Sequence, residues 1–269
     1  MQHAPLIALL TDFGLSDPYV GQMRSVLLAA APGVPLVDIS HGVAPQDVAQ
    51  AAFFLAATLP WLPPAAVVVA VVDPGVGTER RVALLELGSR CIVAPDNGLL
   101  TLVLDGATTF RAFDATPRVT PASATFHGRD VFAPLAARLA MGEPAAAFGC
   151  VLAPEALARL PGLAARRQGD RVTARVLSVD HFGNVVTSCA VARFEALPAA
   201  PRLLAPVSLP LAAVRTYAAI PADGVGLLAG SQGYLELAVP GGSAAARLGV
   251  SRGDTLIFSL PQEGALWGF

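Results

Sequence analysis

Short, solidly apolar runs of sequence constrain most strongly what this chain can fold into. The first spans residues 6–10 and ends in Thr11-Asp12, and residues 36–39, 67–72 and 91–93 repeat its form. Runs of this length are typical of strands that are buried on both faces. Such strands belong to parallel sheets that helices cover on either side, so the first part of the chain is expected to be an α/β domain.

Two helical patterns separate the first three runs. Asp17-Pro18 is typical of a helix start, with an N-cap and a proline at the first helical position, and apolar residues then recur at helical spacing. A second helical stretch covers residues 46–57. The order strand, helix, strand, helix, strand predicts a mostly parallel sheet. Another helix is expected after Asp130, and a helix with a connector is expected within residues 144–170.

The later part of the chain has a different pattern. Short apolar runs at residues 172–179, 185–187 and 234–239 are punctuated by glycine and proline, which predicts a small all-β, barrel-like domain. We therefore expect an N-terminal α/β domain over residues 1–167 and a C-terminal β-barrel domain over residues 168–269.

Composition and charge argue against several classes of protein. More than half of the 269 residues are apolar, so disorder is not expected. The net charge of −2 and the lack of basic runs argue against a nucleic-acid partner. The three cysteines form no CxxC pair, which indicates neither a disulfide framework nor a zinc site and fits a reducing cytoplasm. No signal peptide is expected at residues 1–10, and the longest apolar run, residues 65–72, is too short to cross a membrane.

Aspartates follow the apolar runs at the points where strands are expected to end. They are Asp12, Asp38, Asp73 and Asp96. In open parallel sheets, ligands bind outside the carboxyl ends of the strands, so these four side chains are candidates for a site. The alternative for each one is that it caps a helix or makes a turn.

The segment from Asp73 to Arg81 contains a GxG, but it lacks the third glycine of a dinucleotide-binding motif. A glycine-rich turn that brings Asp73 and Arg80 close together fits the segment better, and a tight turn with a surface ion pair is the alternative. His127 lies at an expected helix start, where a neutral imidazole could accept a proton or orient water, or could be structural. The sequence has no HxH, HExxH, GxSxG or P-loop motif.

Three segments of the second domain carry further candidates. Residues 180–184 offer a carboxylate, an aromatic face and an amide, although on local sequence a hairpin turn is the favoured interpretation. Residues 230–234 and 241–245 are rich in glycine, which lets a ligand approach the backbone closely.

Taken together, these segments resemble the S-adenosylmethionine hydroxide adenosyltransferase family, the hydrolytic relatives of fluorinating and chlorinating enzymes. The resemblance spans nearly the whole chain. It is carried by Leu10-Thr11-Asp12-Phe13-Gly14, Asp38-Ile39-Ser40-His41, Val72-Asp73-Pro74-Gly75-Val76-Gly77-Thr78 with Arg80, Ala94-Pro95-Asp96-Asn97-Gly98, Phe126-His127-Gly128-Arg129-Asp130, Asp180-His181-Phe182-Gly183-Asn184 and the segment from Gly230-Ser231 onward.

The resemblance implies a homotrimer whose sites lie between the N-terminal domain of one subunit and the C-terminal domain of its neighbour. It also implies the residues that bind the substrate. Asp12 is similar to the carboxylate that holds the ribose hydroxyls, and Asp17, Asp180 and Asn184 are similar to contacts to the methionine end. The remaining matches, which would flank the adenine or the sulfonium, are Phe182, Ser231 and Ala244.

The hydrolytic members are distinguished by an aspartate, an arginine and a histidine, which Asp73, Arg80 and His127 match. The resemblance therefore implies hydrolysis of S-adenosyl-L-methionine to adenosine and L-methionine, with no metal or redox cofactor. Asp73 and His127 would orient and polarise the attacking water, and Arg80 would fix the Asp73 carboxylate. Which of the three takes the proton stays open, because they would titrate as a coupled set.

Two alternative functions are open at this point. Asp12, Asp73, Asn97 and His127 could supply the ligands of a metal-dependent phosphoesterase, although the DxH and GNH clusters of such enzymes are missing. The chain could also be a non-catalytic module that binds S-adenosylmethionine or adenosine without turning it over.

Overall fold

The chain forms a mixed α/β protein with two sheets. The computed structural model describes residues 5–116, 121–193 and 200–261. The chain divides into two compact units, residues 1–160 and residues 161–269, and each unit is built around its own sheet. Within the described residues, none of the helices is both long enough and apolar enough to span a membrane.

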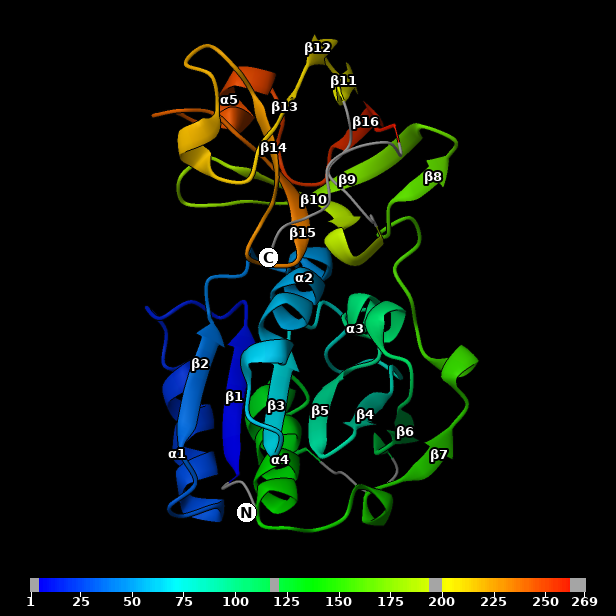
Figure 1. Cartoon of the computed structure of the whole chain (residues 1–269). Helices are drawn as coiled ribbons and strands as arrows, with labels where there is room; N and C mark the ends of the chain where they lie inside the picture. The colour runs from blue at the N-terminus through cyan, green and yellow to red at the C-terminus, as the bar shows by residue number, and fades with distance from the viewer. Residues whose placement is uncertain (1–4, 117–120, 194–199, 262–269) are drawn as a thin grey trace. The chain divides into compact units, whose positions relative to one another are not determined.

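The first unit alternates strands and helices (Figure 1). Its strands are β1 (Leu6–Thr11), β2 (Leu36–Ser40), β3 (Ala66–Val71), β4 (Val82–Leu87), β5 (Arg90–Pro95), β6 (Arg111–Asp114) and β7 (Cys150–Leu152). Its α-helices are α1 (Tyr19–Ala30), α2 (Val48–Thr58), α3 (Thr101–Gly106) and α4 (Ala133–Ala140). Short 3-10 turns lie at Leu59–Trp61, Ala145–Ala147 and Pro154–Ala156, and a π-helical turn at Gly128–Phe132 leads into α4.

The sheet of the first unit is mixed. Its strand order is β2-β1-β3-β5-β4-β6-β7 among the described residues. The pairings β1–β2, β1–β3 and β3–β5 are parallel, whereas β4–β5, β4–β6 and β6–β7 are antiparallel. The expected parallel sheet is therefore present over four strands, and the antiparallel strands extend it on one side. The sequence pattern missed this extension because β4 directly follows the glycine-rich turn and β6 and β7 are short.

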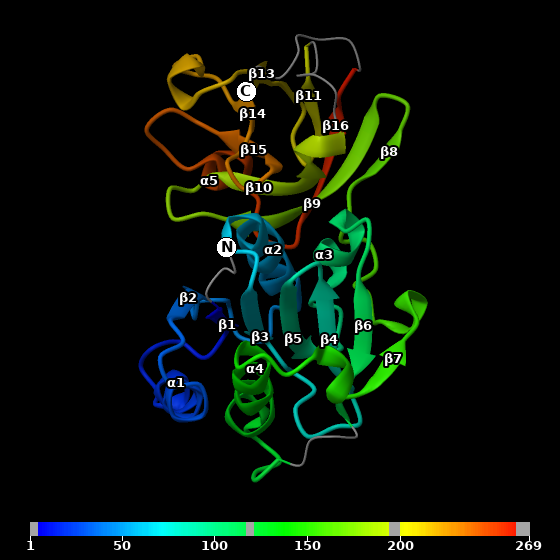
Figure 2. The same cartoon turned by 60° about the horizontal axis from the view of Figure 1, so that its bottom comes forward.

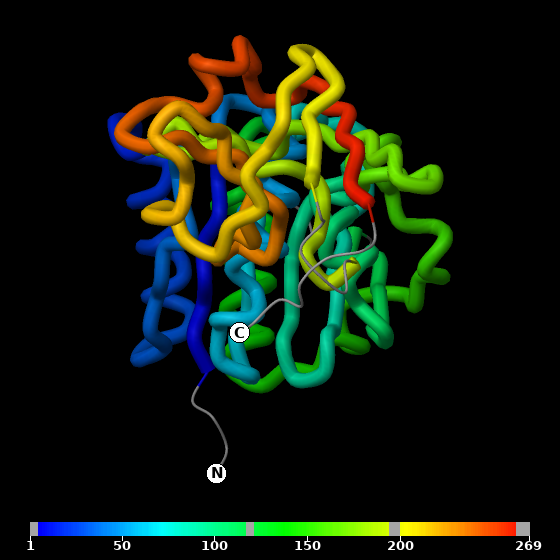
Figure 3. Tube along the Cα trace, turned by 45° about the horizontal axis from the view of Figure 1, so that its top comes forward, coloured from blue at the N-terminus to red at the C-terminus, as the bar shows by residue number. Residues whose placement is uncertain are grey.

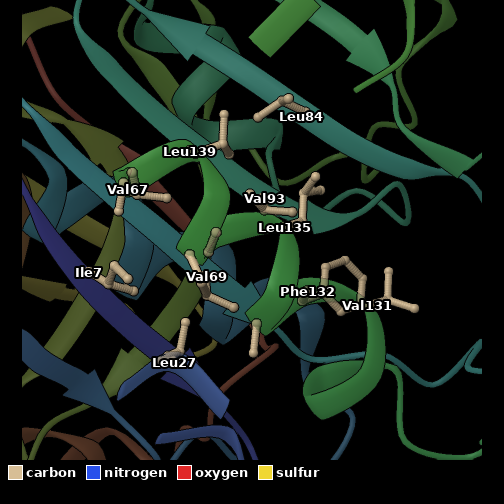
Figure 4. Packing of buried hydrophobic residues seen from close by; sticks show 14 of the residues in the cluster. Ile7, Leu27, Val67, Val69, Leu84, Val93, Val131, Phe132, Leu135 and Leu139 are labelled. Carbon is tan, nitrogen blue, oxygen red and sulfur yellow. The ribbon is translucent and has the colours of Figure 1, made fainter. Parts of the chain in front are cut away.

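Helices cover both faces of this sheet and produce two apolar cores. One core holds Ile7, Leu9 and Val69 of the strands against α1 and α4. Figure 4 shows part of this core, including Ile7 and Val69. The other packs the opposite sides of the same strands, such as Ala8 and Val68, against α2 and α3. Alternate residues of β1 and β3 thus face different cores, which explains why these strands are apolar along their whole length.

The local structure corrects three expectations. The expected strand at residues 36–39 is β2, but it lies at the edge of the sheet and is partly exposed, with Val37 43% exposed, rather than buried on both faces. The N-cap of α1 is Pro18, one residue after the expected Asp17, so the proline precedes the first helical position, and no side chain caps this helix. The described residues between 144 and 170 hold 3-10 turns and short strands in place of the expected helix, since prolines at 144, 154 and 161 interrupt the segment.

The second unit is a curled, barrel-like sheet (Figure 2). Its strands are β8 (Arg166–Gln168), β9 (Arg171–Val179), β10 (Val185–Ala190), β11 (Arg202–Ala205), β12 (Leu209–Pro210), β13 (Ala212–Ala213), β14 (Gly226–Ala229), β15 (Tyr234–Ala238) and β16 (Thr255–Ser259). The strand order is β12-β11-β16-β9-β10-β15-β14-β13, with β8 paired to β9. The hairpin of β11 and β12 can be followed in yellow in Figure 3.

The core of the second unit lies on the concave side of its sheet. Alternate residues of β9, such as Val172, Ala174 and Val176, pack there together with Leu256 and Phe258 of β16. The unit is not purely β, because the short helix α5 (Ala244–Leu248) closes the core, and 3-10 turns lie at Val191–Arg193 and Tyr217–Ala219.

Candidate active site in the first unit

The carboxyl ends of β1 and β3 bring two of the expected aspartates to one edge of the sheet. The two strands are parallel neighbours, and their register pairs Thr11 with Val71. Asp12 and Asp73 follow these positions almost directly, so both carboxylates lie at the end of the sheet where ligands bind in this class of fold.

The turn after β3 is built by glycines. The Val76 amide donates to the Asp73 carbonyl over 3.2 Å, and the Thr78 amide donates to the Gly75 carbonyl over 3.1 Å. Gly77 has φ +78, and a Cβ there would lie 2.9 Å from the Ala124 carbonyl oxygen. A side chain at residue 77 would therefore meet both backbone strain and a clash, and the GxG serves this turn rather than a dinucleotide.

Asp73, Arg80 and His127 form one connected chain of side chains. Arg80 Nε donates to both carboxylate oxygens of Asp73 over 2.9 Å, and Arg80 Nη2 adds a further hydrogen bond to the same carboxylate. Arg80 Nη2 also lies 2.9 Å from His127 Nδ1. The side chains of Asp73 and Arg80 are only 5% and 10% exposed, which makes this a desolvated ion pair rather than a surface one.

The arginine decides which nitrogen of His127 carries the proton. A guanidinium only donates, so Nδ1 of a neutral His127 accepts from Arg80 and the proton lies on Nε2. Burial, and after it the positive charge of Arg80, lowers the pKa of His127 from its ordinary value of 6.5, against the opposing effect of two nearby carboxylates. The imidazole is therefore neutral at pH 7, with an N–H available for donation at Nε2.

A cavity of about 430 Å³ lies beside this chain of side chains, entirely within the first unit. Asp12, Asp73 and His127 contribute to its wall, whereas Arg80 does not, and Arg80 instead lies 5.3 Å from the centre of the Phe132 ring. The remaining lining residues are Phe13, Tyr19, Pro45, Gln46, Val71, Val76, Thr125, Phe126 and Gly128. The volume is in the range of small-molecule sites.

Three aromatic rings in the cavity wall were not expected from the sequence as site residues. Phe13, Tyr19 and Phe126 contact one another, with centroid separations of 5.8, 5.8 and 5.2 Å. Phe13 lies beside Asp12 and Phe126 lies beside His127 in the sequence, but no local pattern joins these two rings to each other or to Tyr19. Such a wall suits a flat or cationic group.

Asp12 is held by the loop that precedes α2. Its Oδ2 accepts from the Gln46 amide over 2.7 Å, and Gln46 adopts a left-handed backbone with φ +64. Beneath Asp12, the buried Thr11 hydroxyl lies 2.8 Å from His41 Nδ1, and the Gly14 amide donates to the His41 carbonyl. His41 therefore fastens the loop after β2 to the loop after β1.

The other two strand-end aspartates do not reach the cavity wall. Asp38 lies on the edge strand β2 and pairs with Arg24, and His41 Nε2 lies 3.1 Å from its Oδ1. Asp96 is ion-paired with Arg81 at 2.7 Å and accepts from the Ala158 amide, so it closes a loop of the first unit. The expectation that four aspartates share one site is thus wrong for these two, whose roles are structural.

The aspartate, histidine and amide groups of the first unit are not gathered as a metal site. Both oxygens of Asp73 are engaged by Arg80, and the Asn97 amide donates to the Val72 carbonyl over 2.8 Å. Among the described residues, no group of three or more histidine, cysteine, aspartate or glutamate side chains converges. This arrangement does not favour the phosphoesterase alternative.

In the second unit, residues 180–184 form a turn between β9 and β10. Asp180 Oδ1 accepts from the Phe182 and Asn184 amides over 2.9 and 2.8 Å, and the Asn184 side chain donates to Asp180 Oδ2. The two polar groups therefore define the shape of the turn. The side chain of Phe182 takes no part in these hydrogen bonds and is 75% exposed, so its ring is accessible to a ligand.

The remaining expected substrate residues differ in exposure. Asp17 is exposed in the first unit and lies outside the cavity lining, two positions before Tyr19. Ser231 is exposed in the second unit, whereas Ala244 is fully buried at the start of α5. The Ala244 side chain belongs to the apolar core, so it presents no surface of its own to a ligand in this chain.

Comparison with known proteins supports a family assignment. The N-terminal domain of the SAM hydroxide adenosyltransferases matches residues 7–149, and the C-terminal domain matches residues 174–257. A Salinispora arenicola relative named (R)-S-adenosyl-L-methionine hydrolase is 46% identical over 263 residues, which cover 95% of this chain and 98% of the relative. A Thermus thermophilus relative of the same name is 43% identical over 255 residues, which cover 91% of this chain and 95% of the relative.

A solved structure agrees with these matches. The crystal structure of an uncharacterized conserved protein from Thermotoga maritima superposes with a TM-score of 0.85 at 32% identity, covering 94% of this chain and 99% of that one. Since both family domains and full-length relatives match, the chain belongs to the SAM hydroxide adenosyltransferase family.

Proposed function

We propose that this protein hydrolyses S-adenosyl-L-methionine to adenosine and L-methionine. The observation that carries the proposal is the connected set of Asp73, Arg80 and His127 beside a cavity that Asp12 and three aromatic rings also line. The relatives named (R)-S-adenosyl-L-methionine hydrolase, at 43–46% identity over nearly the whole chain, support the same activity.

The bond changes suit a site that activates water. A water oxygen forms a bond to C5′ of the ribose while the bond between C5′ and sulfur breaks. The electron pair of the broken bond goes to the sulfonium sulfur, which becomes the uncharged thioether of methionine. The leaving group needs no proton, so the catalytic groups act on the nucleophile. In this proposal the reaction takes no metal or redox cofactor.

The tautomer of His127 determines which catalytic residue orients the water and which accepts its proton. His127 Nε2–H donates to the water oxygen and orients it, because its Nδ1 is occupied by Arg80. Asp73 is then the group that accepts the proton of the water as the new carbon–oxygen bond forms. Arg80 holds the carboxylate in place, while the aromatic wall would lie near the cationic sulfonium.

The binding roles follow the family resemblance. Asp12 would hold the ribose hydroxyls, and its fixed orientation on the Gln46 amide supports this role. Asp17, Asp180 and Asn184 would contact the methionine end, and Phe182 and Ser231 would flank the rest of the substrate. For residue 244 we propose a role through the position of α5 rather than through its buried methyl group.

The assembly and compartment are part of the same proposal. A homotrimer with sites shared between neighbouring subunits would bring the first unit of one chain to the second unit of another. A cytoplasmic location agrees with three cysteines that are free thiols in this structure.

The decisive experiment uses the purified, chelator-treated protein and S-adenosyl-L-methionine in oxygen-18 water. Adenosine that carries the heavy isotope, together with unlabelled methionine, is the expected result. Binding of the substrate without formation of adenosine would instead support a binding module. Activity that chelator abolishes and a divalent metal restores would support the metal-dependent alternative.

A further inference from the structure

In the second unit, the outer face formed by β8, β9, β16 and β11 carries four arginines, and these four strands contain no aspartate or glutamate. Register decides which side chains share this face, because residues directly opposite one another in antiparallel strands point to the same side. Between β9 and β16, Arg175 lies opposite Thr255 and Arg171 lies opposite Ser259. Between β9 and β8, Thr173 lies opposite Arg166 and Arg171 lies opposite Gln168. Arg202 of β11 lies opposite Ser259 and completes the row. We call the face formed by Arg166, Arg171, Arg175 and Arg202 the arginine face.

The alternating residues of the same strands lie in the core. Val172 and Ala174 of β9 and Leu256 and Phe258 of β16 are buried in the apolar cluster of the second unit. The arginines therefore cannot turn inward, and they are presented on the convex side of β8, β9, β16 and β11, which lie side by side in Figure 2.

None of these four guanidinium groups has a carboxylate or hydrogen-bond partner among the residues that the structure describes. The arginines of the first unit behave differently, since seven of them are ion-paired: Arg24, Arg80, Arg81, Arg111, Arg129, Arg138 and Arg159. Four like charges gathered on one sheet face repel one another, and an anion bound between them would relieve that repulsion.

A cavity of about 540 Å³ lies on the arginine face. Arg166, Arg175, Thr173 and Thr255 line it, and residues 161–164 and Gly253 form its sides. Arg175 lies against Gly253, where a Cβ would be 3.6 Å from Nη2 and where φ is +93. The glycine thus keeps space open beside the guanidinium.

The spacing of the two arginines fits a single small anion. Arg166 is opposite Thr173, and Arg175 is two residues along the same strand, so the two arginines are diagonal neighbours within reach of one another's long side chains. Two guanidinium forks and two threonine hydroxyls that line one cavity supply more donors than a carboxylate accepts and match the several oxygens of a phosphate group.

We propose that this cavity binds a phosphate group, either as free phosphate or as part of a small phosphorylated molecule. The proposal is independent of the hydrolytic function, because all of the residues that line this cavity belong to the second unit and none of them is a proposed catalytic or substrate-binding residue.

Titration calorimetry of the full-length protein with inorganic phosphate tests the proposal, with chloride at matched ionic strength as the reference. Saturable binding to phosphate is expected. Arg166→Gln and Arg175→Gln should each weaken it about tenfold, because each variant loses a charged bidentate donor. Arg111→Gln, which removes an exposed arginine of the first unit, is the matched control and should leave binding unchanged.

A second ligand identifies the source of the phosphate, and a conservative variant keeps the test valid if a glutamine variant folds poorly. Glycerol 3-phosphate that binds at least tenfold more tightly than inorganic phosphate would indicate a phosphorylated metabolite, and equal binding would indicate free phosphate. Arg175→Lys keeps the charge but loses the fork, so an intermediate affinity is expected even if the glutamine variant folds poorly. The proposal fails if phosphate gives no saturable heat beyond chloride, or if the folded Arg166 and Arg175 variants bind phosphate as the wild type does.

Discussion

In the proposed mechanism, the tautomer of a single histidine, His127, determines the roles of the catalytic residues. Arg80 is the donor to His127 Nδ1, so the imidazole donates rather than accepts at its other nitrogen. In the proposed mechanism Asp73, which is joined to His127 through Arg80, accepts the proton of the water, so the chemistry depends on its charge.

Replacing Asp73 by asparagine should therefore lower turnover by about 10²–10⁴-fold, the usual contribution of a general base, while substrate affinity changes little. Single-turnover rates and equilibrium binding of S-adenosyl-L-methionine separate the two effects. Asp96→Asn is the matched control, because Asp96 is also a buried partner of an arginine but lies outside the cavity lining. Loss of binding with a normal rate for bound substrate would contradict the role given to Asp73.

His41 gives a pH dependence of stability. Burial, followed by the charge of Arg24, lowers the pKa of His41 from its ordinary value of 6.5, which the unfolded chain retains. Below pH 6.5 the unfolded state thus binds more protons, so the stabilisation is present above pH 6.5 and is lost as the pH falls through the folded-state pKa. Urea denaturation of the wild type should show stability declining on acidification. His41→Asn, whose amide oxygen can still accept from Thr11, should show a shallower decline, and equal slopes would contradict the assignment.

The sequence could identify Asp12 and Asp73 because a polar residue after an apolar run marks a strand end. It could also place Arg80 beside Asp73, since a turn of this length returns the chain to its start. It could not separate these aspartates from Asp38 and Asp96, because that distinction depends on which arginine each one meets. Nor could it assemble the aromatic wall, which is made by rings from three separate segments.

At the scale of elements, buried parallel strands were predictable and edge strands were not. β1 and β3 are apolar along their whole length because both faces pack against helices. β6 and β7 are short, and Val151 of β7 is 75% exposed, so their composition differs little from that of loops. The arginine face was equally hidden, because its four arginines are separated in sequence and meet only through strand register.

The turn between β9 and β10 depends on a glycine that packs against the start of α5. Gly183 has φ +85, and a Cβ there would lie 2.4 Å from Ser243 Oγ and 2.7 Å from Ser243 Cα. Gly183→Ala should lower the free energy of unfolding by about 2–4 kcal/mol, from strain and overpacking together. Gly169→Ala is the control, because φ there is +58 but nothing lies within 4 Å, so its cost should be only about 1–2 kcal/mol. Equal losses in urea denaturation would show that contact with Ser243 does not matter.

At the scale of the whole molecule, the two units divide the expected binding residues between them. The catalytic set and Asp12 belong to the first unit, whereas Asp180, Phe182 and Asn184 belong to the second. Each unit has its own apolar core. This division makes the proposed sharing of sites between subunits testable with one inactive variant in each unit.

The two variants are Asp73→Asn, which removes the proposed proton acceptor, and Phe182→Arg, which places a cation where the substrate's sulfonium would approach. Phe182 is 75% exposed, so its replacement should not disturb folding. In a ring of subunits that share their sites, an intact site needs an Asp73 from one variant and a Phe182 from its neighbour. Random co-assembly gives about one quarter of sites with both, so co-expressed variants should recover about one quarter of wild-type activity. If each chain forms its own site, every site carries a substitution and co-expression restores nothing. Separately purified variants that are mixed without subunit exchange should stay inactive in either case, which shows that recovery depends on assembly.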